Sequence, residues 1–159
     1  MSTLPDLIIR RAEPSDLAAI VALNAELNPH DLPLPSDEEV AQVWQQVCDN
    51  PIMHTFVAEH AAQVVATCVL AIMPNLTRGA RPFGLIENVV TARTMRGRGI
   101  GRALLQTVLA FAWQQHCYKV MLLTGRPEAV PFYERIGFHK DVKIGLIAKP
   151  PKDEHDACD

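Results

Sequence analysis

A glycine-rich, basic loop between a predicted strand and a predicted helix constrains this chain more than any other feature. Residues 86–91 are rich in β-branched side chains, which predicts a strand. Residues 96–101 read Arg-Gly-Arg-Gly-Ile-Gly, and the apolar residues behind them keep helical spacing up to about Gln115. Glycines let the backbone approach an anion closely, and the first amides of a helix point at it unpaired. The order strand, loop, helix therefore predicts a pyrophosphate site, reinforced by Arg93, Arg96, Arg98 and Arg102.

Two nucleotide-binding motifs that also use glycine loops are excluded by the residues present. The dinucleotide fingerprint G-x-G-x-x-G requires a glycine where this sequence has Arg102. The strand predicted at residues 120–123 ends at Thr124 and Gly125, without the acidic residue that would bind a ribose. The sequence also contains no G-x-x-x-x-G-K-[ST] loop for a nucleoside triphosphate. The pyrophosphate must belong to another kind of ligand.

The rest of the sequence predicts one α/β domain of the α+β kind. The predicted strands cover residues 7–9, 54–59, 64–73, 83–91, 120–123 and 142–148. The predicted helices cover residues 17–27, 37–50, 100–115 and 127–136, and the second begins with a capping box of Ser36 and Glu39. Gly137 is expected to close the last helix. We expect a single domain over residues 1–149, followed by a polar tail at 150–159.

Composition limits the classes of protein that this sequence allows. A chain of 159 residues is the usual size of one domain, and 48% hydrophobic residues exclude general disorder. A net charge of -3 argues against a nucleic-acid or membrane-surface partner. Cys48, Cys68, Cys117 and Cys158 lie far apart, and no secretory segment follows Met1. We therefore expect free thiols in a cytoplasmic protein.

The glycine loop and its surroundings resemble the GNAT superfamily of acetyl-CoA-dependent acyltransferases. Arg96, Gly99 and Gly101 match the signature [QR]-x-x-G-x-[GA] of that superfamily. The resemblance extends through residues 85–91 and to residues 132–138, which are similar to the F-Y-x-x-x-G-F segment of the family. It implies a GNAT-like domain with a central, mixed, mostly antiparallel twisted sheet of six to seven strands flanked by about four helices. Within the superfamily, residues 86–90 and 117–119 resemble glucosamine-6-phosphate N-acetyltransferases.

The resemblance also implies acetyl-CoA as the co-substrate and no metal. The amides of residues 97–102 would bind the pyrophosphate, and the main chain of residues 89–91 would bind the pantetheine arm. The implied cofactor-binding residues are Val89, Val90, Thr91, Arg96, Gly97, Arg98, Gly99, Ile100, Gly101 and Arg102. Thr91 replaces the usual valine, but a main-chain contact tolerates this change. Arg126 stands where many members have an asparagine, and Pro131 interrupts the following helix.

Acetyl transfer to an amine needs a base, because a primary amine with a pKa near ~10.4 is almost wholly protonated at pH 7. Glu87 is the first candidate, and the alternative is an exposed glutamate that only pairs across the sheet. His30 and Asp31, in a proline-rich connection, are weaker candidates. Together with Asn88, these two residues are the candidate substrate-binding residues.

Tyr133 is the candidate acid. The resemblance places the tyrosine of the F-Y segment near the thioester sulfur, where a phenol can donate a proton to the departing thiolate. The alternative is a half-buried tyrosine that packs in the core. Cys117 is a weaker nucleophile candidate than a packed thiol, because no base accompanies it in the sequence. His54 and His60 lack a third ligand at metal spacing and are interpreted as structural or surface residues.

These observations favour an N-acetyltransferase that acts on a small-molecule amine by direct attack in a ternary complex. One alternative is a regulatory module that binds CoA without catalysis. Another is an acetyltransferase that acts on a protein or peptide amine. A nucleic-acid binder conflicts with the acidic total and with the lack of aromatic residues among the loop arginines. No membrane partner is expected, and a homodimer is kept open beside a monomer.

Overall fold

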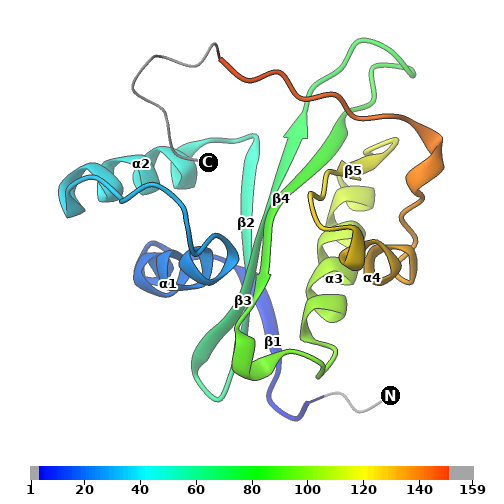
Figure 1. The fold of residues 1–159 in the computed structure, drawn as a ribbon. Helices are drawn as coiled ribbons and strands as arrows, with labels where there is room; N and C mark the ends of the chain where they lie inside the picture. The colour runs from blue at the N-terminus through cyan, green and yellow to red at the C-terminus, as the bar shows by residue number, and fades with distance from the viewer. Residues whose placement is uncertain (1–3, 151–159) are drawn as a thin grey trace. The chain divides into compact units, whose positions relative to one another are not determined.

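The structure is a computed structural model, and it describes residues 4–150. The chain divides into two compact units, the first ending at Leu123 and the second beginning at Thr124. The first unit holds a five-stranded sheet in the spatial order β1-β2-β3-β4-β5 (Figure 1). Its strands are β1 (Ile8–Arg11), β2 (Met53–His60), β3 (Gln63–Met73), β4 (Phe83–Thr91) and β5 (Val120–Leu122).

The sheet is mixed and mostly antiparallel, as expected. The pairs β1–β2, β2–β3 and β3–β4 are antiparallel, and β4–β5 is parallel. A parallel neighbour needs a crossover, and the helix that follows the glycine loop supplies it. The fold class is therefore confirmed, whereas the prediction of six to seven strands is wrong for the described residues, which form five.

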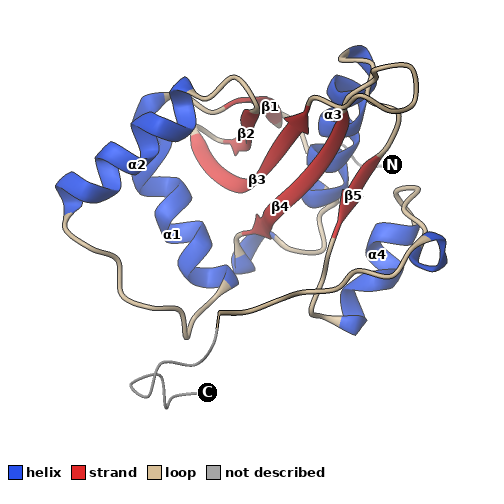
Figure 2. Ribbon diagram, turned by 90° about the horizontal axis from the view of Figure 1, so that it is seen from above, coloured by secondary structure: helices blue, strands red, loops and turns tan. Residues whose placement is uncertain are grey.

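Helices cover both faces of the sheet in the first unit (Figure 2). One face carries α1 (Leu17–Leu27) and α2 (Asp37–Asp49), and the other carries α3 (Ile100–Gln114). The Phe56 ring on β2 meets the Phe111 ring of α3 at a centroid distance of 5.4 Å. Even-numbered residues of β2 therefore face α3, and odd-numbered residues face α1 and α2. This division of faces locates the side chains of the neighbouring strands.

Helix α3 contributes a large part of the core. Its buried side chains recur at helical spacing and come from Ile100, Leu104, Leu105, Val108 and Ala112. They pack against a sheet whose central strands also bury large apolar residues, among them Leu70 and Ile86. The helix that begins at the glycine loop is thereby anchored along its length, which holds its N-terminus in place.

A guanidinium clamp sets the start of α1. Arg10 on β1 donates two hydrogen bonds to the Asp16 carboxylate, at 2.7 and 3.0 Å, and two to Glu59 on β2, at 2.9 and 3.1 Å. Asp16 is buried, and its hydrogen bonds with Arg10 hold the pKa of its carboxyl below the usual range. Asp16 ends the turn η1 (Pro14–Asp16) directly before α1. These hydrogen bonds therefore fix the position of the N-terminus of α1 relative to β1 and β2.

Helix α2 begins with the predicted capping box. The Ser36 hydroxyl accepts a hydrogen bond from the Glu39 amide at 3.3 Å, and the Glu39 carboxylate accepts one from the Ser36 amide at 3.1 Å. Trp44 donates its indole N–H to the Pro14 carbonyl at 3.0 Å. The apolar side chains of α2 are only partly buried, since Val43 is exposed.

The second unit is short and differs from the prediction at its end. The predicted helix at 127–136 is divided into the turn η3 (Pro127–Ala129) and α4 (Val130–Glu134). Pro131 lies in the first turn of α4, where its missing N–H costs no hydrogen bond, so it does not disrupt the helix. Gly137, as expected, has a left-handed φ of 112°.

The strand predicted at residues 142–148 is wrong. The turn η4 (Lys140–Val142) is followed by residues without regular structure up to Pro150. The large apolar side chains of this segment are exposed at Val142, Ile144, Leu146 and Ile147. A strand exists only where a neighbour completes the ladder of hydrogen bonds, and high β-propensity alone does not supply one.

Cys48, Cys68 and Cys117 are free thiols, as expected, and Cys158 lies outside the described residues. Within residues 4–150, no helix has the length and apolar character needed to cross a membrane. The cytoplasmic compartment stays a prediction.

Candidate active site

Strand β4 contains a bulge at the position where the candidate base precedes the candidate cofactor contacts. Val69 of β3 pairs with Glu87 and Thr67 pairs with Val90, so two residues of β4 lie opposite one of β3. Asn88 carries the distortion, with a left-handed φ of 54° that asparagine adopts more readily than most residues. A bulge leaves the extra residue outside the ladder and bends the strand. Backbone groups near Asn88 and Val89 are thereby freed for other partners.

The same part of β4 has an open edge. Strand β5 pairs with Gly84, Leu85 and Ile86, and among the described residues no strand pairs with that edge beyond Ile86. Residues 87–91 therefore present main-chain groups that a bound molecule could pair with, in the manner of an added strand.

Glu87 lies on the sheet face that carries α1 and α2. It pairs with Val69, which pairs with Thr55, and odd-numbered residues of β2 face those helices. Its side chain is exposed to solvent. An exposed carboxylate on this face can be reached by a bound molecule. The structure places Glu87 midway along β4, between the glycine loop and the loop that joins β3 to β4.

The glycine loop has the backbone conformation that only glycine adopts without cost. Gly97 has a φ of 75° and Gly99 a φ of 81°, and a Cβ at either would meet no atom within 4 Å. Gly99 is the N-cap of α3 and supplies no side-chain cap. The first amides of α3 thus have neither an intrahelical acceptor nor a cap, and open space lies beside them.

The arginines around this loop supply positive charge in different ways. Arg96 donates its Nε–H to the Thr91 carbonyl at 3.0 Å, which ties the loop to the end of β4. Arg93 and Arg98 are exposed. Arg102, in the first turn of α3, has a buried Nε without a hydrogen-bond partner within residues 4–150. A buried, unpaired guanidinium N–H is costly unless an acceptor reaches it. The residues of the loop therefore fit an anionic group such as a pyrophosphate.

A second cationic region lies at the other end of β4. The Lys119 ammonium lies 5.2 Å from the Phe83 ring centroid and 5.5 Å from that of Tyr118. The Arg78 guanidinium carbon lies 6.0 Å from the Tyr118 ring centroid. Arg81 donates hydrogen bonds to the carbonyls of His116 and Cys117, both at 3.2 Å. We call Arg78, Arg81 and Lys119 the cationic cluster.

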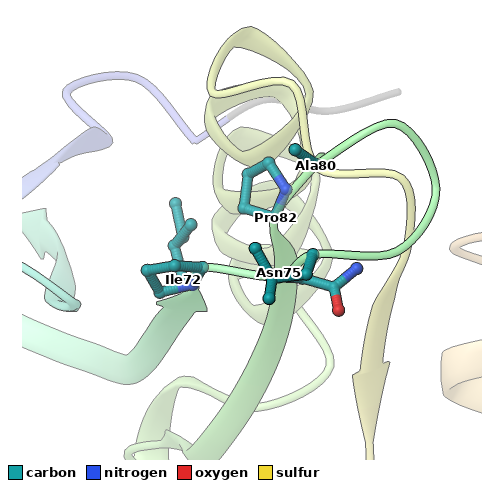
Figure 3. A pocket seen from close by; sticks show the side chains of 6 residues that line it. Ile72, Asn75, Ala80 and Pro82 are labelled. Carbon is teal, nitrogen blue, oxygen red and sulfur yellow. The ribbon is translucent and has the colours of Figure 1, made fainter.

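The loop between β3 and β4 is strained and braced. Arg78, Gly79 and Ala80 all have left-handed φ, at 56°, 71° and 58°. Asn75 braces the loop by donating hydrogen bonds to the Thr77 carbonyl at 3.0 Å and the Arg81 carbonyl at 3.2 Å. An open, mainly apolar groove lies beside this loop (Figure 3), lined by Ile72, Pro74, Asn75, Leu76, Ala80 and Pro82. Backbone strain of this kind is often retained where a loop must present particular groups.

The weaker candidates lie in different surroundings. His30 and Asp31 lie on the exposed connection between α1 and α2, and the Asp31 carboxylate accepts the Leu32 amide at 2.8 Å. Cys117 is buried, and burial raises the pKa of its thiol despite the opposing charge of Arg81. A protonated, buried thiol is a poor nucleophile, in agreement with the expected packed cysteine.

His54 packs its ring edge against Phe111 at 5.1 Å. Burial, with the nearby Arg11 charge, lowers the pKa of this imidazole. Within residues 4–150 no group of three or more His, Cys, Asp or Glu side chains is placed to hold a metal ion. The interpretation of His54 as a structural residue agrees with this packing.

Tyr133 belongs to the second unit. It lies on α4, half-buried, with its ring edge-on to Phe132 at 5.1 Å and to Phe138 at 6.0 Å. The residues of the F-Y-x-x-x-G-F segment thus form a small aromatic cluster closed by the turn at Gly137. The ring is held by packing, which is the condition for either a structural or a catalytic hydroxyl.

Comparison with known proteins identifies the family. A sequence model of the Acetyltransferase (GNAT) family matches residues 18–138. The chain belongs to the GNAT acetyltransferase family. The match covers most of the chain and continues across the boundary between the two units. The enzyme class expected from the sequence, an acetyl-CoA-dependent N-acetyltransferase, is thereby confirmed.

Several relatives of this GNAT protein have names or solved structures. A glucosamine 6-phosphate N-acetyltransferase of Trypanosoma brucei brucei is 33% identical over 87% of this chain and 92% of the relative. One of Candida albicans is 30% identical over 72% of this chain and 76% of the relative. A solved structure of an Agrobacterium tumefaciens str. C58 protein is 42% identical, with a TM-score of 0.85, over 90% of this chain and 99% of that one.

Sequence reasoning missed two parts of the candidate site of this GNAT protein. The cationic cluster joins residues from two distant segments, and the sequence carried no signal for it beyond the charges themselves. Glu26, on α1, accepts a hydrogen bond from the Arg93 amide at 2.8 Å. An acidic residue in the last turn of a helix is electrostatically unfavourable, and this was the signal that could have drawn attention to it.

Proposed function

We propose that this enzyme transfers the acetyl group of acetyl-CoA to the primary amine of a phosphorylated amino sugar, by direct attack in a ternary complex. The observation that carries the proposal is the bulged, open edge of β4, which runs into a loop with two left-handed glycines and a buried, unpaired Arg102 Nε. We assign the pyrophosphate to residues 97–102, together with Arg96. We assign the pantetheine arm to the main chain of residues 89–91.

The proposed acceptor is supported by charge as well as by relatives. The relatives at 33% and 30% identity are named for glucosamine 6-phosphate, which carries both an amine and a phosphate. Glu87 lies about 13 Å along β4 from Phe83, the end of the strand beside the cationic cluster, at roughly 3.3 Å per residue. The Lys and Arg side chains of the cationic cluster are long, so they can span part of this distance and reach the phosphate of an acceptor whose amine lies beside Glu87. We assign the acceptor phosphate to this cluster and the amine to the vicinity of Glu87 and Asn88.

The proposed chemistry needs two proton transfers. Acetyl-CoA supplies the thioester whose acyl carbon the amine attacks. Glu87 accepts a proton from the acceptor amine, directly or through water, so that the nitrogen has a free electron pair. Tyr133 keeps the role that the family resemblance implies, donation of its phenolic proton to the thiolate as the C–S bond breaks. His30 and Asp31 stay proposals as substrate-binding residues.

The two units are proposed to form one acyltransferase domain over residues 1–149, since the family match at 18–138 includes parts of both. The homodimer stays a prediction. The alternatives are a CoA-binding module without catalysis and an acetyltransferase of protein or peptide amines.

A thiol-release assay with a panel of amines tests the proposed function. We expect kcat/KM for glucosamine 6-phosphate to exceed that for glucosamine by about 10- to 100-fold, the equivalent of one charged hydrogen bond of roughly 1.5–3 kcal/mol. Lys119→Gln should remove most of this difference and leave the KM for acetyl-CoA unchanged. Polyamines, aminoglycosides, amino acids and peptides complete the panel.

The other outcomes of the panel would contradict the phosphate assignment or support one of the alternative functions. Equal turnover of glucosamine and its phosphate contradicts the phosphate assignment. Turnover confined to peptides supports the protein-acetylating alternative. Binding of acetyl-CoA without turnover of any amine supports the regulatory module.

Glu87→Gln tests the base. We expect turnover to fall by about 10²-fold at pH 6, where the acceptor is almost wholly protonated, and by less at pH 9. Binding of acetyl-CoA should change little. Glu38→Gln, an exposed change on α2 with the same loss of charge, is the matched control. Wild-type rates from pH 6 to 9 in the Glu87 variant would transfer the role to His30 or to a chain of waters.

A further inference from the structure

Glu26 connects a helix on the face of the sheet to the segment that leads into the glycine loop. Its carboxylate Oε2 accepts a hydrogen bond of 2.8 Å from the backbone N–H of Arg93. Arg93 is the first residue of the turn η2 (Arg93–Met95), which precedes Arg96 and the glycines. Glu26 lies in the last turn of α1. The contact therefore joins two segments 67 residues apart in the sequence.

The position of this carboxylate is unfavourable for α1 itself. The C-terminal end of a helix carries a partial negative charge, so an acidic side chain there destabilises the helix. The last turn of α1 contains no basic residue to offset it. At η2, by contrast, a carboxylate is favourable, because the first amide of the turn needs an acceptor. Ala92, the N-cap of η2, has no side chain that could accept the first amide. Glu26 supplies the missing acceptor from another element.

The other hydrogen bonds of residues 92–96 have partners in the sheet or within the same segment. The Ala92 amide donates to the Val65 carbonyl of β3 at 2.8 Å, and the Met95 amide donates to the Ala92 carbonyl at 2.8 Å. Arg96 Nε donates to the Thr91 carbonyl at 3.0 Å. None of these involves the helical layer. Among these contacts, only the hydrogen bond from the Arg93 amide to Glu26 joins α1 to the segment that precedes the glycine loop.

We propose that Glu26 is a positioning residue for acetyl-CoA binding: its carboxylate holds the Arg93 amide and so keeps the glycine loop in the conformation that receives the pyrophosphate. The inference rests on the proposed function, because it assumes that residues 97–102 bind that group. Without the carboxylate, the Arg93 amide turns to solvent and the loop samples other conformations. The affinity then falls, because only part of the population is competent to bind.

The direction in which acetyl-CoA affinity changes when Glu26 is replaced distinguishes positioning from a purely electrostatic role. Glu26 carries a negative charge near a loop proposed to bind phosphates, so removing that charge by itself should strengthen acetyl-CoA binding. Glu26→Gln removes the charge and keeps an acceptor oxygen for the Arg93 amide. Glu26→Leu removes both. Positioning therefore predicts opposite results for two variants that lose the same charge.

The experiment is titration calorimetry with acetyl-CoA, together with steady-state kinetics and thermal melts. We expect Glu26→Leu to raise the Kd for acetyl-CoA by about 5- to 10-fold, with kcat at saturating acetyl-CoA within about 3-fold of the wild type. Glu26→Gln should bind acetyl-CoA as tightly as the wild type or more tightly. Glu38→Leu, an exposed change of the same kind on α2, should leave the Kd unchanged.

Several outcomes would overturn the inference. If both Glu26 variants bind more tightly than the wild type, the carboxylate acts only through its charge. If Glu26→Leu melts at a lower temperature but keeps the wild-type Kd, its role is structural. If the Gln and Leu variants weaken binding equally, the acceptor oxygen is not what matters. Failure of the wild type to bind acetyl-CoA would instead contradict the proposed function and is recognised separately in the same titration.

Discussion

Replacing Tyr133 with phenylalanine is expected to lower kcat by about 10² to 10⁴ while the affinity for acetyl-CoA stays within a few fold. The substitution removes one hydroxyl and keeps the ring, so the edge-on contacts with Phe132 and Phe138 should survive. The phenol is proposed to protonate the departing thiolate. A CoA thiol has a pKa near the ~8.5 of cysteine, so water replaces the phenol in part and the loss should lie toward the lower end of that range.

Measurement of kcat, the acetyl-CoA Kd and the melting temperature for both proteins separates the possible roles of Tyr133. A large loss of affinity with kcat preserved would make it a residue that packs against the cofactor. Equal kcat and Kd in the two proteins would leave it as a structural tyrosine of the aromatic cluster. A lower melting temperature alone would show that the hydroxyl contributes to folding, not to catalysis.

The second large effect is expected at the glycine loop. Acetyl-CoA at 100 times its Kd stabilises the folded state by about 2.7 kcal/mol, which for a chain of this size raises the melting temperature by roughly 5 to 10 °C. Gly99→Glu should abolish this shift, because it places a negative side chain beside the first amides of α3. The space beside Gly99 is open, so the loss comes from repulsion of the phosphates and not from a clash within the fold.

Backbone strain is the main confounding effect, and the chain offers a matched control for it. Gly79 has a φ of 71°, close to the 81° of Gly99, and a Cβ there also meets no atom within 4 Å. Gly79→Glu therefore adds the same charge under the same strain, but in the loop between β3 and β4. We expect this variant to keep the acetyl-CoA shift. A normal shift in the Gly99 variant would contradict the assignment of the pyrophosphate to residues 97–102.

Much of the cofactor half of the site could be predicted because its parts are contiguous in the sequence. The strand, the loop and the helix follow one another, and the left-handed angles at Gly97 and Gly99 are a local requirement that glycine meets. The capping box of Ser36 and Glu39 is local in the same sense, since its partners are three residues apart. Patterns of this kind indicate structure without knowledge of the rest of the fold.

The C-terminal segment shows where local pattern fails. Residues 142–148 have the apolar, β-branched character of a strand, yet they form none in the structure. Strand formation depends on hydrogen bonds from a neighbour, which propensity does not provide. The same limit applies to the bulge at Asn88, because the register of β4 against β3 is set by the pairing of residues about twenty positions apart.

The sequence by itself determined the α/β class, the family resemblance, the glycine loop and the free thiols, because each depends on composition or on residues close along the chain. The tertiary structure decided how distant residues meet. It brought Glu26 to the Arg93 amide, placed Lys119 against the Phe83 and Tyr118 rings, and left β4 without a partner strand beyond Ile86 among the described residues. These contacts follow from the packing of helices on a sheet with one particular register, and no short stretch of sequence encodes that register.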